Sequence, residues 1–197
     1  MDDHDDLWLQ RWLPLLRQAA AGEPVLELGC DTGRDTAWLA AQGLAVIGTD
    51  ISLRALSACA AAVPSARLLA HDLRKPLPFR DGQFGAVIAS LCLHYFDWAA
   101  TVAAVSEVRR VLRPSGVLLC RLNSIRDVLH GAGAGDEIEP HYWRVHGAYA
   151  ECKRFFDAAD LERLFGAQWE RVAVEETTIR RYSEPKVCWE LVLRAGR

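Results

Sequence analysis

Residues 25–33 read Val-Leu-Glu-Leu-Gly-Cys-Asp-Thr-Gly, a short apolar run that ends in a glycine-marked turn. Helical periodicity follows over about residues 34–42, so this stretch predicts a strand, a tight turn and a helix. Glycines in such a turn let backbone N–H groups approach a ligand closely. Many nucleotide-binding folds contain this turn, but a strand–helix turn without a ligand produces the same pattern. The turn therefore indicates a fold class and leaves the ligand open.

Strand-like and helical segments alternate on both sides of this turn. The strand candidates are 25–28, 45–49, 66–70, 85–90 and 117–122, and the helix candidates lie at about 34–42, 52–62 and 97–112. Continuous apolar strands separated by helices are typical of a parallel sheet covered on both faces. The sequence thus predicts an α/β protein with a Rossmann-like, doubly wound sheet.

The composition is that of an ordinary globular protein, with 197 residues, 51% hydrophobic, 25% charged and a net charge of −3. This charge gives no electrostatic reason to expect nucleic acid as a partner. The acidic start does not resemble a signal peptide, and no apolar run approaches the roughly 20 residues that span a bilayer. Six cysteines stand singly and the histidines are dispersed, which predicts neither disulfides nor a metal site. We therefore expect a cytoplasmic protein without a membrane partner.

The pattern changes after Asn123. Residues 124–150 contain Gly131-Ala-Gly-Ala-Gly135, which predicts a mobile loop. Helical periodicity returns over 157–165, and strand-like runs follow at about 169–178 and 186–194. We expect a single domain that comprises an N-terminal helix (1–23), a cofactor-binding core (24–123), a lid or acceptor segment (124–156) and a closing helix with strands (157–197).

Three acidic residues stand at the ends of successive predicted strands. Glu27 lies just before the glycine turn, Asp50 ends the second strand, and Asp72 follows the third. The carboxyl ends of parallel strands meet at one crevice, where open α/β sheets bind their ligands. A carboxylate at Asp50 can accept hydrogen bonds from both hydroxyls of a ribose, and Asp72 can accept one from an adenine amino group. Three acids at successive strand ends predict a nucleoside site better than they fit solvated loops.

The acidic pattern also selects among nucleoside ligands. A dinucleotide would place its pyrophosphate on the first turn, where Glu27 would repel it, and Gly29-Cys-Asp31 breaks the G-x-G-x-x-G fingerprint. S-adenosylmethionine carries no phosphate, and its amino-acid end has an ammonium group that a carboxylate suits. The sequence therefore favours S-adenosylmethionine over a nicotinamide dinucleotide.

These residues resemble the class I S-adenosylmethionine-dependent methyltransferase superfamily. Glu27-x-Gly29-x-Asp31-x-Gly33 looks like its first motif, and residues 90–96 (Ser-Leu-Cys-Leu-His-Tyr-Phe) lie where its fourth-strand motif stands. Leu112-Arg-Pro-Ser-Gly116 is similar to the turn before the family's fifth strand. The resemblance implies seven strands, mostly parallel with the last antiparallel, and helices on both faces. The cofactor-binding residues that we predict are Glu27, Gly29, Cys30, Asp31, Gly33, Asp50, Ile51, Asp72, Leu73 and Ser90.

A narrower resemblance concerns LHYF at residues 93–96, the stretch 121–124 (Arg-Leu-Asn-Ser) and Lys153-Arg-Phe-Phe156. Together with the glycine-rich segment they look like bacterial proteins near the tellurite-resistance methyltransferases. One departure from the superfamily is Asp31, which stands where the family usually has glycine. Aspartate tolerates a left-handed backbone better than most residues, so the turn can survive.

Candidates for the acceptor site come from the fourth and fifth strand ends and from the later segment. His94 and Tyr95 are candidate catalytic residues, as a base or a hydrogen-bond partner. The candidate substrate-binding residues are Arg121, Asn123, Tyr142 and Arg154, with His141, Trp143 and Phe155 as further members of a lid wall. A structural role for each of these side chains stays open at this stage.

The function predicted is direct methyl transfer from S-adenosylmethionine to a small-molecule acceptor, with the protein aligning the two reactants. The alternative is a non-catalytic or degenerate nucleotide-binding module, because Asp31 departs from the motif and the acceptor residues are unproven. A nicotinamide-dependent oxidoreductase is disfavoured by Glu27 and by the missing third glycine.

Overall fold

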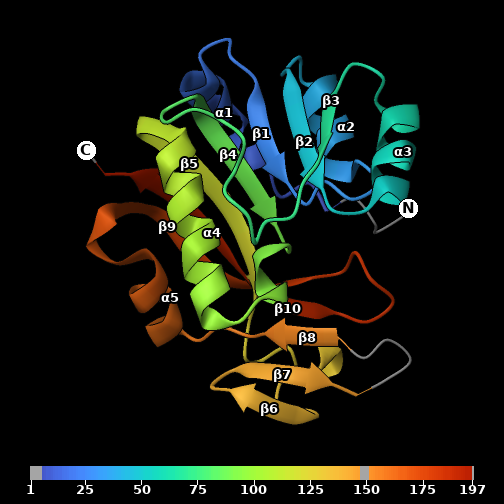
Figure 1. Ribbon diagram of the computed structural model, residues 1–197, viewed down its shortest axis with the longest axis vertical. Helices are drawn as coiled ribbons and strands as arrows, with labels where there is room; N and C mark the ends of the chain where they lie inside the picture. Colours follow the sequence, from blue (N-terminus) through green and yellow to red (C-terminus); the bar gives the residue numbers. More distant parts are fainter. Residues whose placement is uncertain (1–5, 147–150, 197) are drawn as a thin grey trace.

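The computed structural model describes residues 6–146 and 151–196, and a seven-stranded sheet forms its centre (Figure 1). Its strand order is β3-β2-β1-β4-β5-β10-β9. The strands are β1 Val25–Leu28, β2 Val46–Asp50, β3 Arg67–Ala70, β4 Phe84–Ser90, β5 Leu112–Asn123, β9 Trp169–Ile179 and β10 Lys186–Ala195. Strands β1 to β5 are parallel, and β10 runs antiparallel to both β5 and β9. The predicted doubly wound sheet with seven strands is confirmed.

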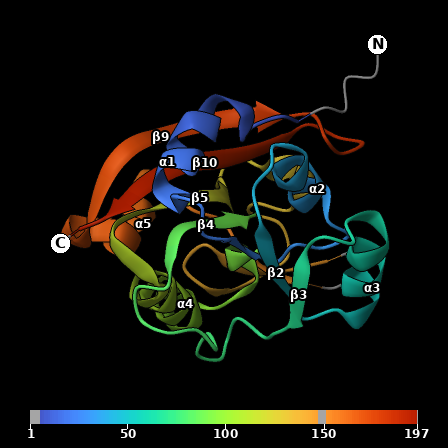
Figure 2. The same ribbon diagram turned by 90° about the horizontal axis from the view of Figure 1, so that it is seen from above.

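Helices cover both faces of this sheet, as Figure 2 shows from above. On one face, α4 (Trp98–Val111) and α5 (Ala158–Phe165) pack on apolar residues of β1, β4, β5 and β10. On the other face, α1 (Leu13–Ala20) and α2 (Arg34–Ala41) share a second apolar core with the opposite side of the same strands. Helix α3 (Leu53–Ala62) packs beside β2 and β3. Within the described ranges, no helix is long and apolar enough to cross a membrane.

The strand order places a crevice between β1 and β4. The chain proceeds from β1 outward to β3 and then returns to the other side of β1 with β4. Loops that leave β1 and β4 therefore diverge, and the space between them lies beyond the carboxyl ends of the strands. The glycine turn after β1 borders this crevice.

The segment after β5 differs from the prediction. The glycine-rich stretch predicted a mobile loop over 124–150, but the structure contains a three-stranded antiparallel sheet of β6 (Asp136–Glu139), β7 (Tyr142–Val145) and β8 (Glu151–Arg154). At Gly135, an added Cβ would collide with the Arg144 carbonyl. This glycine thus permits the close approach of the chain at Arg144, and its role is in packing. Residues 147–150 of the predicted loop lie outside the described residues.

Figure 1 places this small sheet beyond the carboxyl ends of β4 and β5, on the same side as the crevice. It contacts the 3-10 helix η2 (Leu93–Tyr95), which follows β4. Whether the small sheet moves as a lid stays a prediction.

Helix α1 lies unusually close to β4. A Cβ at Gly85 would collide with the backbone carbonyl of Ala19 at the end of α1, and Arg113 donates a hydrogen bond to the same carbonyl. This contact positions α1 and, before it, Trp8 and Leu9, which are both buried. Gly85 is therefore required by packing and has ordinary backbone geometry.

We expect Gly85→Ala to destabilise the protein by about 1–3 kcal/mol, because the added methyl group overpacks the contact between α1 and β4. Urea unfolding of the variant and of the natural protein measures this difference. An unchanged unfolding midpoint would show that α1 does not pack against β4 in the way described.

Candidate functional site

A cavity of about 390 Å³ lies at the carboxyl ends of β1, β2, β3 and β4. Its lining includes all the predicted cofactor-binding residues except Gly33. The predicted members are Glu27, Gly29, Cys30, Asp31, Asp50, Ile51, Asp72, Leu73 and Ser90. Residues that end or follow four strands, β1 to β4, therefore meet around one space, as the parallel topology requires.

The glycine turn is shaped by the contact between β1 and the end of β4. Gly29 has a φ of +62°, and a Cβ there would collide with the Cys92 side chain. Asp31 also has a left-handed backbone, with a φ of +47°, so it occupies a conformation that favours glycine. Gly33 opens α2 with a φ of +93° and packs against Cys59 of α3, away from the cavity lining.

Asp50 joins two turns at the end of β2. Its Oδ2 accepts a hydrogen bond from the Asp31 backbone N–H at 3.0 Å, and its Oδ1 accepts one from the Ser52 N–H at 2.8 Å. An ionised carboxylate has about four acceptor positions. Asp50 therefore retains acceptor capacity toward the cavity while its orientation is held by backbone groups.

Glu27 is the buried acid of the site. Its residue exposure is 3%, and the Thr36 hydroxyl donates a hydrogen bond to its Oε2 at 2.6 Å. Burial raises the pKa of Glu27 to about 8; the Thr36 hydrogen bond opposes this rise, and the nearby acids Asp35 and Asp50 add to it. At pH 7 this carboxyl group therefore carries a proton unless a cation binds beside it.

Asp72 already has a partner. The guanidinium and backbone N–H of Arg74 occupy both of its oxygens, with the shortest contact, from Nη2 to Oδ2, at 2.7 Å. These bonds lower the pKa of Asp72 to about 2. The contact with an adenine amino group stays a prediction, and it would share the carboxylate with Arg74.

Several lining residues were not predicted from the sequence. They are Arg34, Asp35, His71, Arg74, Leu91, Cys92, Phe96, Arg181 and Tyr182. Most follow the predicted residues by a few positions, so a wider window around each strand end would have found them. Arg181 and Tyr182 are different, because they come from the turn between β9 and β10 and have no local sequence signal.

The two candidate catalytic residues differ in their exposure to the cavity. Tyr95 lines the cavity and is 45% exposed. His94 is 3% exposed, and its Nδ1 has no hydrogen-bond partner within the described part of the chain. Burial, with Lys186 and Lys153 nearby, holds the pKa of His94 well below its usual range, so its imidazole is neutral. His94 stands behind the cavity wall, and Tyr95 forms part of it.

Two arginines predicted to bind substrate have structural partners instead. Arg121 is 1% exposed and forms ion pairs with Glu190 and Asp6. Arg154 is equally buried, pairs with Glu139 and donates to the Phe96 carbonyl at 3.3 Å. Both side chains connect separate segments of the chain, and neither lines the cavity, so the substrate contacts predicted for them stay a prediction.

The other two predicted substrate residues also lie outside the cavity lining. Asn123 is fully buried, and its side-chain amide has no partner within residues 6–146 and 151–196. The Tyr142 hydroxyl donates to the Tyr95 carbonyl at 3.3 Å, so it links the small sheet to η2. Among the predicted lid-wall residues, Phe155 is buried and packs edge-on against Trp143.

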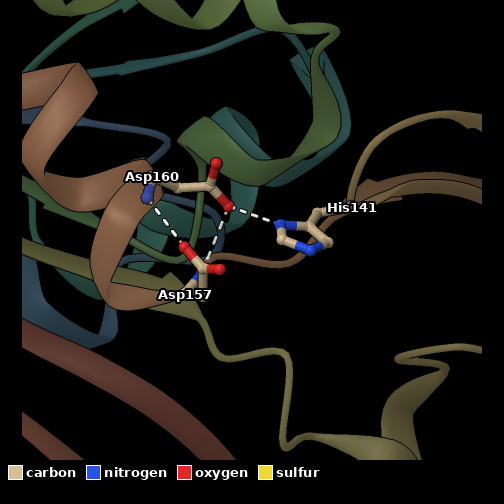
Figure 3. Close-up of side chains that lie close together, drawn as sticks. All are labelled: His141, Asp157 and Asp160. Carbon is tan, nitrogen blue, oxygen red and sulfur yellow. Dashed lines mark hydrogen bonds and ion pairs between the residues drawn. The ribbon is translucent and has the colours of Figure 1, made fainter.

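A histidine and two aspartates cluster at the start of α5 (Figure 3). Asp157 and Asp160 form a reciprocal capping box, and His141 Nδ1 lies 2.6 Å from Asp160 Oδ2. These bonds satisfy the first turn of the helix and attach the β6–β7 turn to it. We assign the cluster to helix capping; the absence of a metal from the function stays a prediction.

The segment that forms most of the cavity lining is similar in sequence to a known protein family. A family model described as a methyltransferase domain matches residues 25–116, which include the glycine turn, Asp50 and Asp72. Residues 25–116, just under half of the chain, thus resemble a methyltransferase domain in sequence. This similarity supports the superfamily predicted from the sequence.

Curated relatives match over part of their own length. An uncharacterised methyltransferase from Synechocystis is 39% identical over 106 residues, which are 53% of this chain and 50% of that protein. A demethylmenaquinone methyltransferase from Beutenbergia cavernae is 37% identical over 115 residues, which are 58% of this chain and 46% of that protein. The chain thus spans about half the length of the curated relatives it matches.

Solved structures share the fold of the methyltransferase domain over nearly the whole chain. One from Methanosarcina mazei, described as a SAM-dependent methyltransferase, has a TM-score of 0.78 at 18% identity and covers 93% of this chain and 97% of that one. The 1,6-didemethyltoxoflavin-N1-methyltransferase of Burkholderia thailandensis has a TM-score of 0.69 at 20% identity and covers 98% and 82%. At these identities the likeness establishes the fold.

Glu27 makes the stability of the protein depend on pH. Its folded-state pKa of about 8 lies above the ordinary value, so the folded protein binds more protons than the unfolded chain between about pH 4.5 and 8. The free energy of unfolding without ligand should therefore fall as the pH rises through this range. The decrease that Glu27 causes in the free energy of unfolding is on the order of 2–4 kcal/mol, and Glu27→Gln should remove it.

Urea unfolding at pH 5 and pH 8 measures this effect, with the exposed Glu23→Gln as the matched control. We expect the Glu27 variant to gain stability over the natural protein at pH 8 and the control to behave as the natural protein. Parallel pH profiles for all three proteins would show that Glu27 stays ionised when buried.

Proposed function

We propose that this protein transfers a methyl group from S-adenosylmethionine to a small-molecule acceptor. The observation that carries the proposal is the convergence of Glu27, Asp50 and Asp72 from three strand ends on one cavity beside the glycine turn. The match of residues 25–116 to the methyltransferase domain family supports it.

The residues present fit this cofactor group by group. The buried carboxyl of Glu27 suits the ammonium group, because a bound cation offsets the cost of ionising Glu27 there. Asp50, held by two backbone N–H groups, would accept hydrogen bonds from the ribose hydroxyls. Asp72 and Leu73 would flank the adenine. An anionic pyrophosphate at the same turn would offer Glu27 no counter-charge, whereas the ammonium group does, which favours S-adenosylmethionine over a dinucleotide.

S-adenosylmethionine supplies a methyl group that its positive sulfur activates toward a nucleophile. The protein then needs mainly to align the acceptor and to exclude water, and alignment contributes several kcal/mol in the best cases. Tyr95, Phe96 and Tyr182 give the cavity aromatic walls for a planar or apolar acceptor. Where the acceptor arrives protonated, neutral His94 is the base that we propose. Burial raises the pKa of Tyr95 to about 12, so its hydroxyl would stay protonated and serve as a hydrogen-bond partner.

The acceptor class follows from the relatives as a proposal. A demethylmenaquinone methyltransferase is among the sequence relatives, and one structural neighbour was solved with 1,6-didemethyltoxoflavin. Both names describe ring compounds, which the aromatic walls of this cavity would suit. We add tellurite to the acceptors to be screened because of the narrower resemblance of residues 93–96 and 121–124.

Asp50 tests the cofactor assignment. Asp50→Ala should weaken binding of S-adenosylhomocysteine about 10- to 100-fold, as expected when a charge-assisted hydrogen-bonding group is lost. Because Asp50 also holds two turns, an analogue without both ribose hydroxyls separates the two roles. The variant and the natural protein should bind that analogue equally well. Calorimetry provides the dissociation constants.

The exposed Asp81→Ala is the matched control and should leave both affinities unchanged. Natural protein that binds NAD but neither S-adenosylmethionine nor S-adenosylhomocysteine would overturn the proposed function. Binding of S-adenosylmethionine without transfer of a labelled methyl group to any screened acceptor would favour the non-catalytic module.

Asp31 tests how far the site departs from its family. Because its φ of +47° favours glycine and the residue lines the cavity, Asp31→Gly should keep or tighten the affinity for S-adenosylmethionine. Asp31→Asn removes the charge but keeps a residue that tolerates this backbone, so it separates repulsion from strain. Titration at two salt concentrations measures both effects. A clear loss of affinity in the glycine variant would mean that Asp31 binds the ammonium group.

A further inference from the structure

The hairpin that joins β9 to β10 contributes to the cavity from a distant part of the sequence. Figure 1 shows this hairpin extending beneath the carboxyl ends of the parallel strands. Two residues of its turn, Arg181 and Tyr182, line the same cavity as Glu27 and Asp50. The hairpin therefore adds a positive charge to a space that is otherwise rich in carboxylates.

Arg181 is held near the N-terminal segment by a weak contact. Its side chain is 17% exposed, and its guanidinium Nη1 lies 4.0 Å from Asp6 Oδ2, at the limit of an ion pair. Asp6 makes its close bonds to the buried Arg121 instead. The Tyr182 ring lies 5.3 Å from the guanidinium carbon. Arg181 is thus placed at the cavity with hydrogen-bonding capacity for a further anion.

The acidic residues near Arg181 show at which end of the cavity its guanidinium lies. Asp35 is 8% exposed, and the Trp8 indole N–H donates a hydrogen bond to it at 3.1 Å. Burial raises the pKa of Asp35, while Arg181 and Arg121 oppose that rise, so Arg181 lies within electrostatic range of this carboxyl group. The negative charge of Asp35 in turn raises the pKa of Glu27. Asp35 also lines a smaller pocket together with Asp6, whose carboxylate lies 4.0 Å from the Arg181 guanidinium, so Asp35 and Arg181 lie at the same end of the cavity.

A carboxyl group and an arginine at one end of the cavity are complementary in charge to a zwitterion. An amino-acid group carries an ammonium, which a carboxylate binds, and a carboxylate, which an arginine binds with two parallel hydrogen bonds. We propose that Arg181 binds the carboxylate of the cofactor's amino-acid end while Glu27 binds its ammonium. The inference rests on the proposed function. It assigns to the β9–β10 hairpin the selection of cofactors that carry an intact amino-acid end.

Two ligands distinguish this role from a general one. S-adenosylhomocysteine has the amino-acid end, and 5′-methylthioadenosine has the same nucleoside and thioether without it. Arg181→Ala should weaken binding of S-adenosylhomocysteine about 10- to 100-fold and leave binding of 5′-methylthioadenosine unchanged. Arg181→Lys should recover part of the loss, because it keeps the charge but loses the bidentate geometry. Calorimetry at low and high salt should show a smaller loss at high salt.

The neighbouring Arg180 is the matched control, since it is exposed and does not line the cavity. Arg180→Ala should bind both ligands as the natural protein does. Retained binding of 5′-methylthioadenosine also reports that each variant is folded around the nucleoside site.

Three results would overturn the inference. Equal weakening of both ligands by Arg181→Ala would assign the hairpin a structural role. Unchanged binding of both would assign the carboxylate to another cation, and Arg34→Ala, at the other lining arginine of this end, would then show the selective loss. Failure of the natural protein to bind S-adenosylhomocysteine would remove the proposed function, whereas the first two results leave it standing.

Discussion

The architecture of the cavity depends on the close approach of the β1 turn to the end of β4. Gly29 can take its left-handed backbone without a side chain, and Cys92 occupies the space that a side chain would need. This contact brings the first and fourth strand ends together and aims the turn at Asp50, which accepts the Asp31 N–H. Without it, the acids of the three strands would not face one space.

The close packing around the β1 turn also destabilises the folded protein when no ligand is bound. Glu27 lies buried where its charge is poorly solvated, so its pKa rises to about 8. Asp35 is buried beside it, with Trp8 as hydrogen-bond donor. Functional sites often carry such destabilised groups, because a bound ligand supplies the missing counter-charge. The stability of this domain and the affinity of its site are therefore linked through one carboxyl group.

Long-range ion pairs hold the outer wall of the site. Arg121 on β5 is buried between Glu190 of β10 and Asp6 of the N-terminal segment. Breaking a buried pair by removing one partner is expensive, so this network fixes the position of the N-terminal segment. Arg181 approaches the same Asp6 from the hairpin. The N-terminal segment and the β9–β10 hairpin thus meet beside the cavity through the shared carboxylate of Asp6.

The sequence by itself determined the alternating strands and helices, the glycine turn and the acids at three strand ends, because these features depend on neighbours a few residues apart. The tertiary structure alone decided the role of Arg121, whose partner Asp6 is 115 residues away. It also placed Arg181 and Tyr182 at the cavity, and it formed the small sheet β6–β8 directly after the glycine-rich stretch, where the sequence predicted only a loop. Periodicity and strand-end rules act locally, whereas burial and charge pairing between distant segments appear only when the chain folds.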